Sequence, residues 1–141
     1  MKKYFKFLLL LILMAGCDDP KPHDLLPQRD VNVTIDLGLP IYQNLLVPGG
    51  YAYTPSSPEY GFRGILVYNR NNSFVAYERA CPHYAVNDCA AMVFDGLYLK
   101  CLCDNSTFNV LNGGYSTTVD YLAREYHVEM LSSNILRISN Y

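Results

Sequence analysis

The sequence predicts an all-β domain of antiparallel strands. Apolar and polar side chains alternate from Val31 to Leu37, which is the period of a strand with one buried face. Two turn sequences, Asn69-Arg70-Asn71-Asn72 and Asp95-Gly96, lie between apolar runs and are typical of β-hairpins. No stretch combines a helical period with capping residues, so we expect no α-helix to organise the core.

The first 16 residues have the pattern of a bacterial export signal. Three lysines precede an unbroken apolar run of ten residues, Phe7 to Gly16, which is shorter than the roughly 20 residues that span a bilayer. The ending Leu13-Met14-Ala15-Gly16-Cys17 resembles a lipobox, at which bacteria lipidate the cysteine and make it the mature N-terminus. We therefore expect residues 1–16 to be removed and Cys17 to be lipidated; the alternative is an ordinary signal peptide.

The residues after Cys17 are polar and interrupted by prolines, which is typical of a tether rather than of a packed core. We expect a lipoprotein signal peptide at 1–16, the lipidated cysteine with a flexible tether at 17–30, and a β domain at 31–141. The lipid would anchor the domain to a bacterial membrane in the cell envelope, either facing the periplasm or exposed at the surface.

Composition limits the classes of partner. Without Lys2, Lys3 and Lys6 of the signal, the chain keeps 8 basic against 13 acidic residues, a net charge of -5. We expect no nucleic-acid partner, because no basic face can form. No nucleophile motif, phosphate loop or dinucleotide fingerprint is present, so we expect a carrier or binding module and not an enzyme.

Turn residues divide the rest of the chain into short strands. Glycines and prolines between positions 48 and 61 indicate a long loop around a short strand at 51–53. Two hairpins follow, one around the asparagine-rich turn and one around Asp95-Gly96. We expect their strands at 64–68, 73–79, 91–94 and 97–100, and further strands at 107–111, 124–131 and 135–139.

Four cysteines flank the 91–100 hairpin. Cys81-Pro82-His83 precedes the hairpin, Cys101-Leu102-Cys103-Asp104 follows it, and Cys89 lies between the two clusters. Because the two loops enter and leave one hairpin, we expect Cys81 and Cys101 to lie side by side at the same end of the sheet. The spacing, Cys-x-His and then Cys-x-x-Asp, resembles the Rieske iron-sulfur signature of Cys-x-His followed by Cys-x-x-His.

This resemblance implies a Rieske-like antiparallel β-sandwich with two cluster-binding loops, which hold a [2Fe-2S] cluster. Cys81 and Cys101 match the thiolate ligands of one iron, and His83 matches an imidazole ligand of the other. Asp104 replaces the second histidine; a carboxylate can bind iron, and its negative charge would lower the reduction potential. The implied function is electron transfer to a redox partner in the cell envelope.

The resemblance also assigns roles to residues around the cluster. Cys89 and Cys103 match a disulfide that joins the two loops, and Ser106 matches a serine that donates to a cluster sulfur. Other positions depart from the family: Leu102 replaces a proline, Asn105 replaces a glycine, and the segment at 115–121 lacks the prolines of the loop that covers the cluster.

Two alternatives to the iron-sulfur cluster remain open at this point. In an exported protein Cys81 can pair with Cys101, which leaves a Rieske-shaped scaffold held by two disulfides and without metal, acting in structure or interaction. Zinc is the other alternative, because Cys81, His83, Cys101 and Asp104 are all residue types that bind it.

Overall fold

The computed structural model describes residues 24–140 of the chain. The expected signal peptide, Cys17 and the first part of the expected tether lie outside the described residues. No helix among residues 24–140 has the length and hydrophobicity needed to cross a membrane. The regular elements of this part of the chain are β1 (Asn32–Asp36), η2 (Pro40–Leu46), β2 (Tyr51–Tyr53), η3 (Pro58–Tyr60), β3 (Ile65–Arg70), β4 (Ser73–Glu78), β5 (Val93–Asp95), β6 (Tyr98–Lys100), β7 (Thr107–Asn109), β8 (Tyr115–Ser116), β9 (Glu125–Ser132) and β10 (Ile135–Ser139).

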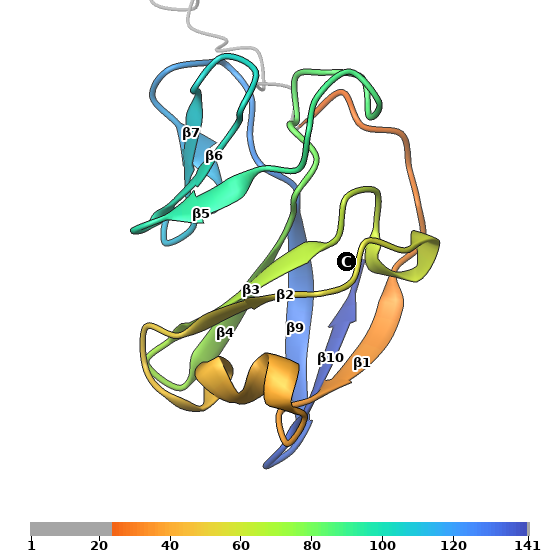
Figure 1. The fold of residues 1–141 in the computed structure, drawn as a ribbon, viewed down its shortest axis with the longest axis vertical. Coiled ribbons are helices and arrows are strands. Elements are labelled where there is room, and N and C mark those ends of the chain that lie inside the picture. Colours follow the sequence, from red (N-terminus) through yellow and green to blue (C-terminus); the bar gives the residue numbers. More distant parts are fainter. Residues whose placement is uncertain (1–23, 141) are drawn as a thin grey trace, which may run out of the picture.

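The strands form two antiparallel sheets, which confirms the all-β prediction. The larger sheet has the order β1-β10-β9-β4-β3-β2, and the smaller sheet has the order β5-β6-β7-β8. Figure 1 shows the smaller sheet as a separate lobe at one end of the molecule, with the long loop between β4 and β5 beside it. The chain therefore leaves the larger sheet at β4, builds the small lobe, and returns through β9.

Strands β3 and β4 lie between two hydrophobic cores. Ile65, Val67 and Ala76 belong to the first core, which packs between the larger sheet and the 3-10 helix η2. Leu66 and Tyr77 point to the other face and join the second core, which continues into the small lobe. Burial on both faces explains why these two strands are almost continuously apolar in sequence.

Both predicted hairpins form. Asn71 and Asn72 have φ values of 55° and 66°, so the asparagine turn uses the left-handed backbone that asparagine tolerates. The second turn lies one residue later than predicted, because Asp95 pairs with Tyr98 and the turn residues are Gly96 and Leu97. The helix η2 was not expected; it begins at a proline and buries Tyr42 and Leu45 in the first core.

A buried carboxylate holds the end of β4, where the first cysteine loop begins. The Glu78 side chain is fully buried. Its Oε1 accepts hydrogen bonds from the backbone N–H groups of Arg63 and Ala80 at 2.9 and 3.0 Å. Its Oε2 accepts from the Phe62 N–H and the Tyr126 hydroxyl, both at 2.9 Å. Burial, followed by the nearby Glu78 charge, raises the pKa of Tyr126 well above its ordinary value.

We predict that Glu78→Gln lowers the free energy of unfolding by about 3 kcal/mol, because an amide nitrogen would face buried donors that need an acceptor. Tyr126→Phe is the matched control; it removes one donor and should cost about 1 kcal/mol. Urea unfolding with the disulfides intact measures both values. An unfolding midpoint of Glu78→Gln equal to that of the wild type would show that the carboxylate does not stabilise the fold.

Candidate functional site

The four domain cysteines meet where the two loops converge. Cys81 and Cys89 lie on the loop after β4, and Cys101 and Cys103 lie on the loop after β6. The Cα atoms of Cys81 and Cys101 are 5.7 Å apart, as expected from their positions around one hairpin. The local fold thus brings the two cysteine motifs into a single site.

Both pairs of cysteines are joined by disulfides. Cys89 is bonded to Cys103, the pairing that the resemblance implied, and Cys81 is bonded to Cys101, the pairing of the metal-free alternative. The two bonds touch, because the Cys89 Sγ lies 3.4 Å from the Cys81 Sγ and 3.6 Å from the Cys101 Sγ. Three of the four sulfurs therefore form one compact group.

The sulfur group extends from the core to the surface. Cys101 is fully buried, and Cys81 and Cys89 are 3% and 5% exposed. These three residues belong to the second hydrophobic core, together with Met92. Cys103 is exposed and lies at the other end of the Cys89–Cys103 bond, which we call the outer disulfide. The Cys81–Cys101 bond is the inner disulfide.

His83 and Asp104 form a pair next to the sulfurs. The His83 Nε2 donates to the Asp104 Oδ2 over 2.7 Å, and the imidazole stacks on the ring of Tyr121 with centroids 5.7 Å apart. Since an ionised carboxylate only accepts, Nε2 carries a proton in this contact, and in the tautomer with no second ring proton the lone pair is on Nδ1. This Nδ1 is buried and has no hydrogen-bond partner among the described residues.

Asp104 is held by several hydrogen bonds. Its Oδ1 accepts from the backbone N–H of Ser106 at 3.0 Å and from the Ser106 hydroxyl at 2.8 Å. Burial opposes ionisation of the carboxyl, but the bonds from Ser106 and His83 outweigh it and hold the pKa of Asp104 below its ordinary value. Asn105 has a φ of 63°, so this position keeps the left-handed backbone that suits the family's glycine.

The residues expected to bind metal are brought together, but in this form they do not fit a [2Fe-2S] cluster. Ligand atoms of His83, Cys101 and Asp104 lie within 4.8 Å of one another. Cluster iron needs cysteine thiolates, whereas the sulfurs of Cys81 and Cys101 are bonded to each other. The contact with Asp104 occupies Nε2 of His83 and leaves only Nδ1 for a metal. Zinc would also need the Cys81 and Cys101 sulfurs as thiolates, so this form does not fit zinc either.

The segment from residue 24 to 30, expected as the end of the tether, packs on the domain. The Leu25 N–H donates to the Pro82 carbonyl at 2.7 Å, beside the first cysteine loop. Asp24 accepts two hydrogen bonds from Arg124, at 2.8 and 2.6 Å, with both side chains at most 10% exposed. Leu26 is also buried. Composition alone did not reveal these contacts, since they depend on a partner about 100 residues away.

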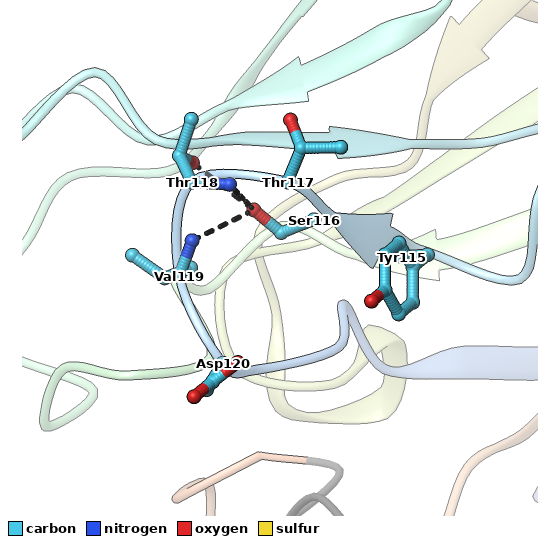
Figure 2. A pocket seen from close by; sticks show the side chains of 6 residues that line it. All are labelled: Tyr115, Ser116, Thr117, Thr118, Val119 and Asp120. Atoms are coloured by element: carbon cyan, nitrogen blue, oxygen red, sulfur yellow. Dashed lines mark hydrogen bonds between the residues drawn. The ribbon is translucent and has the colours of Figure 1, made fainter.

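A surface pocket lies on β8 and the four residues that follow it. Figure 2 shows the Ser116 hydroxyl accepting hydrogen bonds from the backbone N–H groups of Thr118 and Val119, at 3.2 and 3.3 Å. This serine-centred turn stands where the resemblance expected a proline-rich covering loop. The pocket contains none of the site residues described above, since it is lined by Tyr115, Ser116, Thr117, Thr118, Val119 and Asp120.

Comparisons with known proteins identify the fold. No protein-family model and no curated protein sequence matches the chain. The ferredoxin of carbazole 1,9a-dioxygenase from Nocardioides aromaticivorans IC177 is similar in structure, with a TM-score of 0.50 and 17% identity over 81% of this chain and 100% of that one. A chain of the complex of reduced oxygenase and oxidized ferredoxin in carbazole 1,9a-dioxygenase has a TM-score of 0.44 and 21% identity over 65% and 82% of the two chains. The first of these likenesses, together with the antiparallel sheets, shows a Rieske-like fold, as the sequence resemblance implied.

We predict that the four domain cysteines carry no free thiol in the isolated protein. Protein purified without oxygen would be denatured, alkylated without reduction, digested and analysed by mass spectrometry. The expected cross-linked peptides join Cys81 to Cys101 and Cys89 to Cys103. Alkylation of Cys81 and Cys101, with only the other bond present, would contradict the two-disulfide form.

Proposed function

We propose that this protein is a Rieske-fold lipoprotein of the bacterial cell envelope that acts without a cluster, as a structural or interaction module. One observation carries the proposal: the Cys81–Cys101 disulfide removes both thiolates that a cluster would need. An exported domain suits this chemistry, because disulfides persist in oxidising compartments.

The two disulfides make the loops a rigid surface. They close segments with sequence separations of 20 and 14 residues, and a loop of such length is worth about 3 kcal/mol in the chain-entropy model. Leu102, on the second loop between two bonded cysteines, is 50% exposed. A rigid apolar tip binds a partner at a lower entropic cost than a flexible one does. We infer that the tip contacts a protein partner in the envelope.

A lipid anchor on Cys17 would orient the domain relative to the membrane. Six residues lie between the lipobox cysteine, Cys17, and Asp24, so the chain from one to the other spans at most about 25 Å. The Leu25 N–H is bonded to the Pro82 carbonyl in the first cysteine loop, and Asp24 is paired with Arg124. Figure 1 shows the start of the orange segment next to the green loop between β4 and β5. A lipid on Cys17 would thus keep the cysteine loops close to the membrane surface.

We predict that Cys17→Ser releases the protein from the membrane fraction or blocks its processing, because lipidation needs the thiol. The domain should keep its structure, since Cys17 lies outside the two disulfides. Fractionation and intact mass of the wild type and the variant measure this. Unchanged membrane retention together with normal processing would refute the anchor.

Electron transfer by a [2Fe-2S] cluster is the second candidate. The partnerless buried Nδ1 of His83 favours it, because this nitrogen is free to bind iron. The structural likeness to a ferredoxin also agrees with a carrier rather than an enzyme. In a reduced protein the ligands would be Cys81, Cys101, His83 and Asp104, and the bound cluster would supply one-electron transfer.

Metal analysis separates the two candidates. We predict that protein produced with iron available and purified without oxygen shows no visible charge-transfer bands, iron or acid-labile sulfide. Asp104→His, which restores the family's imidazole, should also stay colourless while the Cys81–Cys101 bond is intact. Stoichiometric iron and sulfide in the wild type would replace the cluster-free proposal with electron transfer.

A further inference from the structure

We propose that the four domain cysteines form a thiol-disulfide relay, in which reducing equivalents from a partner dithiol enter at Cys103 and pass through Cys89 to the buried Cys81–Cys101 bond. The exposure of the cysteine residues gives the relay its direction. Cys103 is exposed, Cys89 is 5% exposed, and Cys101 is fully buried. An external thiolate therefore reaches the outer disulfide first.

The contacts between the two bonds supply the internal step. Cys89 Sγ lies 3.4 Å from Cys81 Sγ and 3.6 Å from Cys101 Sγ, so it touches both atoms of the inner disulfide. Cys103 Sγ instead lies near the Asp88 carbonyl, at 3.8 Å. Cys89 is thus the sulfur that belongs to the exposed bond and also reaches the buried one. A thiolate held in contact with a disulfide exchanges much faster than one in solution.

The inner bond is protected from direct attack. Cys81 and Cys101 pack in the second core with Leu99 and Phe108, both of which are fully buried. Exchange requires the attacking thiolate to approach a sulfur, and the core excludes an external molecule from these two atoms. The route through Cys89 avoids opening that core.

The reaction balances with one dithiol as the reductant. A thiolate of the dithiol attacks Cys103, forms a mixed disulfide and releases Cys89 as a thiolate. Cys89 then attacks Cys81, which forms a Cys81–Cys89 bond and releases the Cys101 thiolate. The second thiol of the dithiol resolves the mixed disulfide and releases Cys103. The dithiol loses two electrons and two protons; the protein keeps one disulfide and gains thiols at Cys101 and Cys103.

A rearranged disulfide is the signature of the relay. Full-length oxidised protein in mild detergent would be treated with substoichiometric dithiothreitol, quenched with an alkylating reagent at successive times and mapped without further reduction. At early times we expect molecules in which Cys101 and Cys103 are alkylated and Cys81 is cross-linked to Cys89. Label on Cys89 and Cys103, with the inner bond intact at all times, would overturn the relay.

A double variant tests the route independently. In Cys89→Ala/Cys103→Ala the inner bond should be reduced about tenfold more slowly than in the wild type, because its internal attacker is gone. Cys17→Ser is the control; it removes a cysteine outside the relay and should react at the wild-type rate. Circular dichroism checks that both variants are folded. If the double variant is unfolded, the disulfide mapping of the wild type decides whether the relay exists. Equal rates in the double variant and the wild type would overturn the relay.

Metal analysis and disulfide mapping test the cluster-free function and the relay separately. Iron and acid-labile sulfide in the isolated protein refute the cluster-free proposal. The pattern of labelled cysteines in the oxidised protein decides the relay, whatever the protein binds after reduction.

Discussion

The packing of the cysteine sulfurs between two loops is the constraint on which the small lobe depends. Strands β5, β6 and β7 have three residues each and β8 has two, at or below the short end of the usual range, so backbone pairing in this sheet is limited. The lobe is held instead by the second core, in which Cys81, Cys89 and Cys101 pack with side chains from β3 and β4. The disulfides then fix the loops that enter and leave the lobe.

Two buried polar clusters position the first cysteine loop from either side. Glu78 binds the Ala80 N–H immediately before the loop, and its carboxylate leaves no room for a side chain at position 61, where a Cβ would lie 2.0 Å from Oε2. Asp24 and Arg124 form the other cluster and keep the 24–30 segment against the loop. A buried charge is stable only when it is paired or hydrogen-bonded, so each cluster fixes the backbone around it.

The local features of the fold were predictable from sequence, and those set by distant partners were not. The hairpins at Asn71-Asn72 and after Asp95 follow from turn chemistry, and the proximity of Cys81 and Cys101 follows from the hairpin between them. The η2 helix, the docking of Asp24 and the burial of Glu78 depend on contacts far along the chain. The residue types in the sequence indicated the candidate site. The pairing of the cysteine sulfurs and the bond from His83 to Asp104 became known only from the positions of these residues in the structure.

The aspartate at position 104 and the inner disulfide are consistent with each other. A second imidazole would offer iron a neutral nitrogen, whereas Asp104 is already bound to His83 and Ser106, and these bonds favour its ionised form. Both of its oxygens already accept hydrogen bonds, so iron would compete with these donors for the carboxylate. Without a metal to hold them apart, two thiols whose Cα atoms are 5.7 Å apart meet the geometric requirement for a disulfide. Such a bond persists in oxidising compartments, so the hydrogen-bonded Asp104 and the cross-linked cysteines fit one metal-free arrangement of the site.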